Sequence, residues 1–189
     1  MSILNNAKKF YQYKNSINKL LSNISQNQIN QSIKLIEKTI MQNGRLYIVG
    51  NGGSASIASH ISVDFAKIAK IKSSTFNNSN LITCFANDYG YENWLSKAIN
   101  FYADPDDHLI LISSSGRSKN IINAAKEGKK KNLHLTTLTG FSKNSELSRL
   151  SNISLWVNSK AYNIIENTHQ IWLLIVCDML VGKTVYSSS

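Results

Sequence analysis

The chain has 189 residues, of which 42% are hydrophobic and 17% charged. This length suits one domain with a sizeable core, and the hydrophobic content excludes a largely disordered chain. The net charge of +10 would suit a nucleic-acid or membrane partner, but the basic residues are mostly lysines spread along the chain. Their one tight run, residues 129–131, falls where a helix should end and favours a solvated helix end. We therefore expect no nucleic-acid partner.

The sequence also argues against export and against membrane insertion. Its N-terminus lacks a basic start followed by an apolar segment, and the longest apolar run, residues 171–177, is too short to span a bilayer. Cys84 and Cys177 lie far apart in apolar runs, where we expect small buried hydrophobes in a reducing compartment. We expect a cytoplasmic protein with no membrane partner.

Residues 1–43 are predicted to form two helices with apolar stripes. Apolar residues recur at three- and four-residue spacing, at Phe10, Tyr13, Ile17, Leu20, Leu21 and Ile24 and then at Ile29, Ile33, Ile36 and Ile40. A polar break at residues 25–28 separates the two helices, and Asn43-Gly44 ends the second. These stripes must either cover a sheet of this chain or bundle with another copy of it.

From residue 44 onward, strand-like and helix-like segments alternate. We expect strands near residues 45–49, 81–86, 108–113, 134–139 and 152–157, and helices near residues 54–70, 92–102, 117–130, 144–149 and 161–181. Residues 73–80 are expected to be a polar loop. The alternation predicts an α/β fold, with a parallel sheet covered by helices on both faces. Ligands of such sheets bind at the carboxyl ends of the strands.

A glycine-rich turn follows the first predicted strand. The residues Gly50-Asn51-Gly52-Gly53-Ser54 join that strand to a helix, a geometry that points free backbone N–H groups at an anion. Glycine lets a ligand approach the backbone closely, and serine hydroxyls can add donors. A tight turn with an N-cap serine explains the same stretch equally well.

A second loop of this kind favours anion binding. The apolar strand predicted at residues 108–113 runs into Ser113-Ser114-Ser115-Gly116-Arg117-Ser118 and then into a helix. Serine hydroxyls and backbone N–H groups at a helix N-terminus can surround a phosphate, whereas turn and cap roles explain only some of the four serines. Arg117 could add charge or point to solvent. The chain has neither a P-loop lysine nor a nucleotide-binding fingerprint.

Four motifs in this order resemble the sugar isomerase (SIS) domain family. They are Gly50-Asn51-Gly52-Gly53-Ser54, Asn87-Asp88-Tyr89-Gly90-Tyr91-Glu92, Ser113-Ser114-Ser115-Gly116-Arg117-Ser118 and Leu138-Thr139-Gly140. The chain looks most like the phosphoheptose isomerase branch, whose members interconvert sedoheptulose 7-phosphate and D-glycero-D-manno-heptose 7-phosphate.

This resemblance covers nearly the whole chain and implies an architecture. It implies a single SIS domain over residues 1–189 with a flavodoxin-like five-stranded parallel sheet. Residues 44–183 would form the phosphosugar-binding core. Residues 1–43 would form a helical pair used in oligomerisation, at the centre of a homotetramer with active sites between subunits.

The resemblance also implies which residues bind a sugar phosphate. The matching positions are Asn51, Gly52, Gly53 and Ser54 in the first loop, Asn87 and Asp88 in the second motif, and Ser113, Ser114, Ser115 and Ser118 at the phosphate.

Aldose–ketose isomerisation needs a base for a carbon-bound proton and an acid or metal for the developing oxyanion. His60 and Asp64 lie one turn apart on the helix behind the first loop. Such a pair by itself is more often a polar helix face. The resemblance implies that His60 binds zinc. It also implies that Asp64 is the base and a metal ligand, although it is one methylene shorter than the family's Glu.

The last predicted helix carries the rest of the implied site. In Ile165-Glu166-Asn167-Thr168-His169, Glu166 takes the place of a Gln that binds metal and substrate in the family. Leu174 stands where the family has a catalytic, zinc-binding His, and leucine can do neither job. We expect structural roles for His108 and His134, and a structural or subunit-contact role for His169.

Two functions remain open on this basis. The first is a zinc-dependent phosphoheptose isomerase that supplies heptose for lipopolysaccharide precursors, with Asp64 as base and with His60, Asp64 and Glu166 at the metal. The alternative is a non-catalytic phosphosugar-binding SIS protein that acts as a sensor or scaffold. Leu174 favours the alternative, whereas His60 and Asp64 favour the enzyme.

Overall fold

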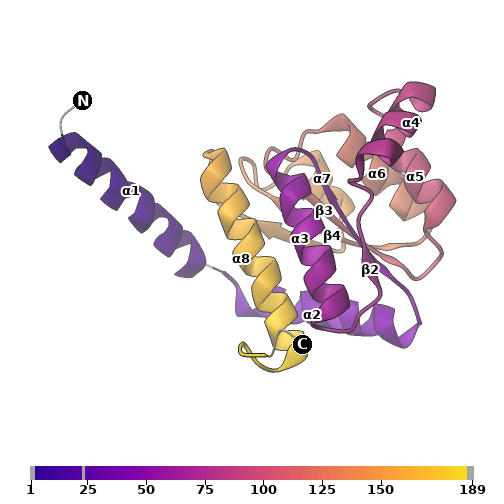
Figure 1. Ribbon diagram of the computed structural model, residues 1–189, viewed down its shortest axis with the longest axis horizontal. Helices are drawn as coiled ribbons and strands as arrows, with labels where there is room; N and C mark the ends of the chain where they lie inside the picture. The colour runs from indigo at the N-terminus through magenta and orange to yellow at the C-terminus, as the bar shows by residue number, and fades with distance from the viewer. Residues whose placement is uncertain (1–2, 23, 187–189) are drawn as a thin grey trace.

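The computed structural model describes residues 3–22 and 24–186, and a parallel sheet lies at its centre (Figure 1). The strands are β1 (Leu46–Gly50), β2 (Ser73–Ser74), β3 (His108–Ser113), β4 (His134–Thr139) and β5 (Ile153–Trp156). Their order, β2-β1-β3-β4-β5, is flavodoxin-like, and every neighbouring pair is parallel. The expected α/β fold is confirmed, with its five-stranded sheet and two leading helices.

Helices cover both faces of this sheet. They are α1 (Ile3–Ser22), α2 (Gln26–Met41), α3 (Gly53–Lys67), α4 (Ser79–Tyr89), α5 (Trp94–Tyr102), α6 (Lys119–Lys130), α7 (Glu146–Leu150) and α8 (Tyr162–Val181). The helices α2, α3 and α8 pack over one face, against Ile48 and Ile110 among others, and α5 and α6 pack over the other face, against Val49 and Leu111. Both faces are apolar because successive strand residues point to opposite sides of a sheet that is buried on both.

The two leading helices differ in what they cover. Ile29 and Ile36 of α2 are buried in the core, so this helix covers the chain's own sheet. Figure 1 shows α1 standing away from the sheet. Leu20, near its end, packs on the core, but Phe10 and Tyr13 are 65% and 43% exposed. The fold therefore uses the stripe of α2 and leaves most of the α1 stripe uncovered.

The expected strand at residues 81–86 is wrong, because this segment is the middle of α4. Asn78 caps the helix, since its side chain accepts a hydrogen bond from the Leu81 N–H. Leu81 and Phe85 lie one turn apart and pack against the core. Helical spacing therefore decides which residues of this short apolar run face inward. The second strand is instead β2, inside the expected polar loop at residues 73–80. Cys84 is exposed and not buried as expected, whereas Cys177 is buried.

The last helix, α8, is long and apolar enough by composition to cross a membrane. In the fold, however, its inner face packs into the core between the other helices of that layer. Trp172, Leu173 and Val176 are buried there, and α8 contacts α2 and α3. A helix that covers a sheet and has further helices packed beside it is expected to be mostly apolar.

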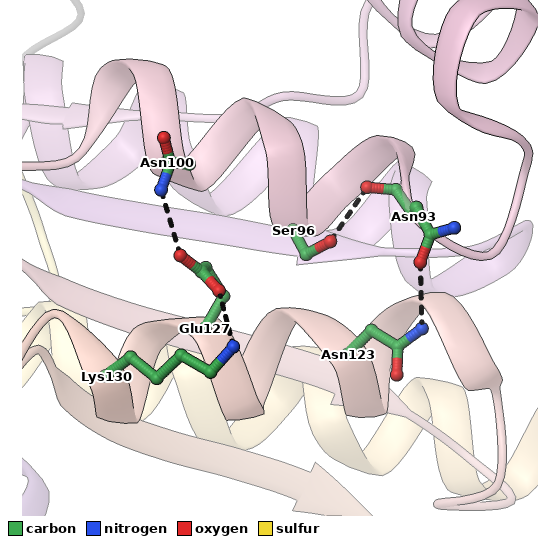
Figure 2. A network of polar contacts seen from close by, with 6 residues as sticks. All are labelled: Asn93, Ser96, Asn100, Asn123, Glu127 and Lys130. Carbon is green, nitrogen blue, oxygen red and sulfur yellow. Dashed lines mark hydrogen bonds and ion pairs between the residues drawn. The ribbon is translucent and has the colours of Figure 1, made fainter.

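A polar network fixes α6 against α5 (Figure 2). Asn123 of α6 donates to the Glu92 carbonyl at 2.9 Å and lies 3.4 Å from Asn93 Oδ1. At the other end, Asn100 donates to Glu127 at 3.0 Å, and this hydrogen bond is the main reason that the pKa of Glu127 lies below its ordinary value. The network holds the helix whose N-terminus follows the serine-rich loop.

Two histidines lie in the core, as expected for structural residues. His108 Nε2 is 2.8 Å from Thr136 Oγ1, and His169 Nε2 donates to the Thr139 carbonyl at 3.2 Å. Both side chains are fully buried. Burial lowers the pKa of His108 to about 3 and that of His169 to about 4, because a charged imidazole is poorly solvated there.

These two shifts predict a loss of stability in mild acid. The unfolded chain takes up the two protons near pH 6.5, whereas the folded chain resists them down to about pH 4 and pH 3. The free energy of unfolding should fall between pH 6.5 and pH 4 by up to about 1.4 kcal/mol per pH unit for each histidine. Urea unfolding at pH 7, 6 and 5 measures it, and His169→Gln should reduce the slope. A free energy that stays constant over this range would contradict the prediction.

Candidate active site

The two anion-binding loops meet at the carboxyl ends of β1 and β3. These strands are paired from Leu46–His108 to Gly50–Ile112. The glycine turn after β1 and the serine loop after β3 therefore start side by side. The strand order reverses between these two strands, which is where doubly wound sheets bind their ligands.

Two reciprocal amide pairs hold the glycine turn in place. Asn51 and Asn120 exchange two side-chain hydrogen bonds of 2.9 Å each, so the turn is tied to the start of α6. Tyr91 Oη also lies 3.4 Å from Asn51 Oδ1. Asn77 pairs with the backbone N–H and carbonyl of Gly50 at 3.2 and 2.8 Å. No sequence motif pointed to Asn120 or Asn77, because their partners are far away in the chain.

A small cavity of about 130 Å³ opens between the two loops. It is lined by Asn51, Ser54, Ile112, Ser113, Ser114, Ser115, Ser118, Tyr162 and Glu166. Seven of these residues are among those that the resemblance implies for sugar-phosphate binding, whereas Ile112 and Tyr162 are not. A volume of this size equals the share of about four water molecules in the liquid, which suits a phosphate group.

The serines of this cavity are available to an anion. Ser114 is 5% exposed, and its Oγ has no hydrogen-bond partner among the described residues. Ser113 Oγ and Ser118 Oγ are only weakly paired, at 3.4 Å. A buried hydroxyl without a partner costs stability, so an acceptor in the cavity would satisfy it. Arg117 is exposed and does not line the cavity, so the lining offers neutral donors, namely the serine hydroxyls, the Asn51 amide and the Tyr162 hydroxyl.

Glu166 closes the cavity from the side of α8. A Cβ atom at position 53 would collide with the tip of the Glu166 side chain, which would have to move aside, so the Glu166 carboxylate lies directly against the first residue of α3. Burial raises the pKa of Glu166. Glu166 is the one implied site residue outside the two loops that lines the cavity.

The implied catalytic pair lies further along α3. His60 Nε2 is 3.2 Å from Asp64 Oδ2, and their side chains are 50% and 17% exposed. Gln170 of α8 lies on the other side of the imidazole, with Nε2 3.1 Å from His60 Nδ1. Leu174, one turn after Gln170, is partly buried against the core. Nothing in the sequence distinguished Gln170 as a partner of His60.

Two implied substrate contacts lie away from the cavity. Asn87 and Asp88 are exposed at the end of α4 and bond to each other at 3.0 Å. Neither lines the cavity, although Tyr91 in the same motif reaches Asn51. Within one subunit, the fold therefore joins this motif to the site through Tyr91.

The SIS domain family model matches residues 12–140 of this chain. A phosphoheptose isomerase from Helicobacter pylori (strain P12) is 31% identical over 179 residues, which is 92% of each protein. Solved phosphoheptose isomerases show the same fold. The Neisseria gonorrhoeae protein has a TM-score of 0.85 at 24% identity, covering 93% of this chain and 96% of that one. The Francisella tularensis protein has a TM-score of 0.85 at 23% identity, covering 97% and 100%.

The Asn51–Asn120 pair should contribute measurably to stability. Asn120→Leu removes both hydrogen bonds between residues 51 and 120 and puts a leucine against the Asn51 amide. This change should lower the free energy of unfolding by about 1–3 kcal/mol. Urea unfolding at neutral pH measures the loss. Asn123→Leu is the matched control, because it removes another amide of α6, one that bonds to the Glu92 carbonyl just before α5. Equal losses in the two variants would contradict a special role for the pair.

Proposed function

This chain belongs to the SIS domain family, in its phosphoheptose isomerase branch, and from this premise we propose that it interconverts sedoheptulose 7-phosphate and D-glycero-D-manno-heptose 7-phosphate. The observation that carries the proposal is the meeting of the glycine turn and the serine loop in one cavity. The relatives that match almost the whole chain are enzymes of this name.

The serine cavity is the proposed phosphate site. The unpaired Ser114 hydroxyl, the neighbouring serines and the backbone at the start of α3 and α6 would hold the phosphate on C7. Asn51, Gly52, Gly53 and Ser54 would hold the substrate from the other loop, with Glu166 accepting hydrogen bonds from sugar hydroxyls. Asn87 and Asp88 would be a further contact, as the resemblance implies.

The distance between this cavity and Asp64 favours a long sugar. Ser54 and Asp64 are ten residues apart on α3, which corresponds to about 15 Å along the helix axis. An extended seven-carbon chain with its phosphate spans roughly 10 Å by ordinary bond lengths. A sugar phosphate bound among the serines therefore needs a long chain to bring C1 and C2 toward Asp64, and a shorter sugar would end further from this carboxylate.

The chemistry itself needs one base and no net redox change. Asp64 takes a proton from C1 of the ketose, and the electrons of the broken C–H bond form the C1–C2 double bond of an enediol. The C2 oxygen takes up a proton and the C1 hydroxyl loses one, and return of a proton to C2 gives the aldose. Asp64 would be the catalytic residue of this transfer.

Zinc is the metal that the resemblance implies, with His60, Asp64 and Glu166 as ligands. Catalytic zinc sites use three protein ligands as a rule. Only His60 and Asp64 come together, because Glu166 faces Gly53, and the described residues contain no group of three or more His, Cys, Asp or Glu that could hold a metal ion. The described side chains of one chain therefore do not provide the three ligands that zinc requires, and the proton transfer is assigned to Asp64 alone. Zinc binding stays a prediction.

The uncovered stripe of α1 supports a proposal about assembly. Phe10, Tyr11 and Tyr13 are exposed there, and exposed apolar patches mark interaction surfaces. We propose that α1 packs in a homotetramer, with active sites between subunits. A cytoplasmic location and a role in supplying lipopolysaccharide precursors are part of the same proposal.

A non-catalytic sugar-phosphate sensor is the second candidate, and Leu174 is the observation that favours it. Such a protein would bind the ketose phosphate in the serine cavity and leave it unchanged. The retained contact between His60 and Asp64 favours the enzyme over this candidate.

Turnover decides between the two candidates. Purified protein, with and without added zinc, is mixed with sedoheptulose 7-phosphate and followed by phosphorus NMR. We expect an aldose phosphate to appear, and Asp64→Asn to lower kcat by about 10²–10⁴-fold because the base is lost. Asp106→Asn is the matched control, since Asp106 bonds to Gln42 at the opposite end of the sheet. Binding without conversion would favour the sensor.

The serine cavity gives a separate prediction. Ser114→Ala should raise KM by about tenfold, the effect of losing one hydrogen bond to a charged group, with little change in kcat. Because the Ser114 hydroxyl has no hydrogen-bond partner among the described residues, the free energy of unfolding should not fall. Ser154→Ala removes another buried hydroxyl without a partner, on β5 and outside the cavity, and should leave KM unchanged. Equal KM values for the two variants would place the phosphate elsewhere.

A further inference from the structure

The face of α8 toward α3 carries three side chains at successive turns. Glu166, Gln170 and Leu174 follow at four-residue spacing and share one side of the helix. Figure 1 shows α3 and α8 side by side, and they are in contact. Glu166 reaches the first residue of α3, and Gln170 reaches His60, about two turns further along α3. Gln170 is thus the polar group of α8 that contacts the implied catalytic pair.

His60 is held from both sides of its ring. Its Nε2 is 3.2 Å from Asp64 Oδ2, and its Nδ1 is 3.1 Å from Gln170 Nε2. An ionised carboxylate only accepts hydrogen bonds, so His60 Nε2 must donate to Asp64. In the tautomer with its one hydrogen on Nε2, the ring has its lone pair on Nδ1, and the amide NH₂ of Gln170 is the donor that matches it. The three side chains form a directed chain from Gln170 through His60 to Asp64.

We propose that Gln170 is a positioning residue that fixes the His60 ring and, through it, the carboxylate of Asp64. Half of the His60 side chain is exposed, so the contact with Asp64 alone would leave the ring free to turn or to exchange tautomers. The Gln170 amide selects the tautomer with hydrogen on Nε2 and aims that N–H at Oδ2. The other oxygen, Oδ1, is then left to take the substrate proton.

Only the catalytic consequence of this inference rests on the proposed isomerase function. The hydrogen-bonded chain itself is a property of α3 and α8 and can be measured without substrate. Leucine or methionine at position 170 could not provide it, because neither has a donor for Nδ1.

The ring of His60 can be observed directly by NMR of ¹⁵N-labelled protein at neutral pH, as purified and after chelation. Its signals are assigned by their loss in His60→Asn. We expect a protonated Nε2 and an unprotonated Nδ1 in the wild type, and tautomer-averaged signals for both nitrogens in Gln170→Met. Asn167→Leu is the matched control, since this α8 amide bonds to the Asn163 carbonyl at 2.7 Å. Averaged signals in the wild type, or no change in Gln170→Met, would overturn the proposal.

Kinetics then tests the consequence. For sedoheptulose 7-phosphate we expect kcat of Gln170→Met to fall by about tenfold, with KM within about twofold, because the phosphate contacts remain while the base is less well placed. Asn167→Leu should keep both constants. A fall in kcat of Gln170→Met without a change in the His60 ring signals would contradict a positioning role for Gln170. If the wild type shows the expected ring signals but does not convert the substrate, the proposed function fails while the chain of hydrogen bonds stands.

Discussion

The parallel pairing of β1 with β3 brings together two loops that are about sixty residues apart in the chain. Since the strand order reverses there, the helices that follow β1 and β3 leave on opposite faces of the sheet and a cavity opens between their N-termini. The Asn51–Asn120 pair then fixes the two loops relative to each other. Without this pairing, the serines and glycines would be ordinary turn residues, because backbone N–H groups at one helix N-terminus make only half of the cradle.

A second constraint is the close approach of α8 to α3. At the start of α3, the Glu166 carboxylate of α8 lies directly against Gly53. Once the two helices run side by side, residues at successive turns of α8 contact residues at successive positions along α3. The carboxylate of Glu166 therefore faces the phosphate cavity, and the amide of Gln170 faces His60. The packing of α8 on α3 thus positions side chains both at the proposed phosphate site and at the proposed catalytic pair.

The α8 face also explains how this chain departs from the family it belongs to. Glu166 and Leu174 stand where the resemblance implies an amide and an imidazole of a zinc site, and Gln170 between them contacts His60. Gln170 and Asp64 hold the His60 ring between them, and the described residues contain no group of three or more His, Cys, Asp or Glu that could hold a metal ion. The aromatic residues Phe10, Tyr11 and Tyr13 of α1 stay exposed in this fold, and exposed apolar patches mark interaction surfaces.

Local patterns in the sequence determined most of the elements, because strand and helix periodicities are set by which residues must be buried. They gave β1, β3, β4, β5 and the helices around them, and the loop residues that line the cavity. They failed at residues 81–86, where an apolar run too short to show its period became α4. Only the tertiary structure could pair Asn51 with Asn120, 69 residues away, or His60 with Gln170, 110 residues away. Such contacts depend on how whole elements pack, and no local pattern records that packing.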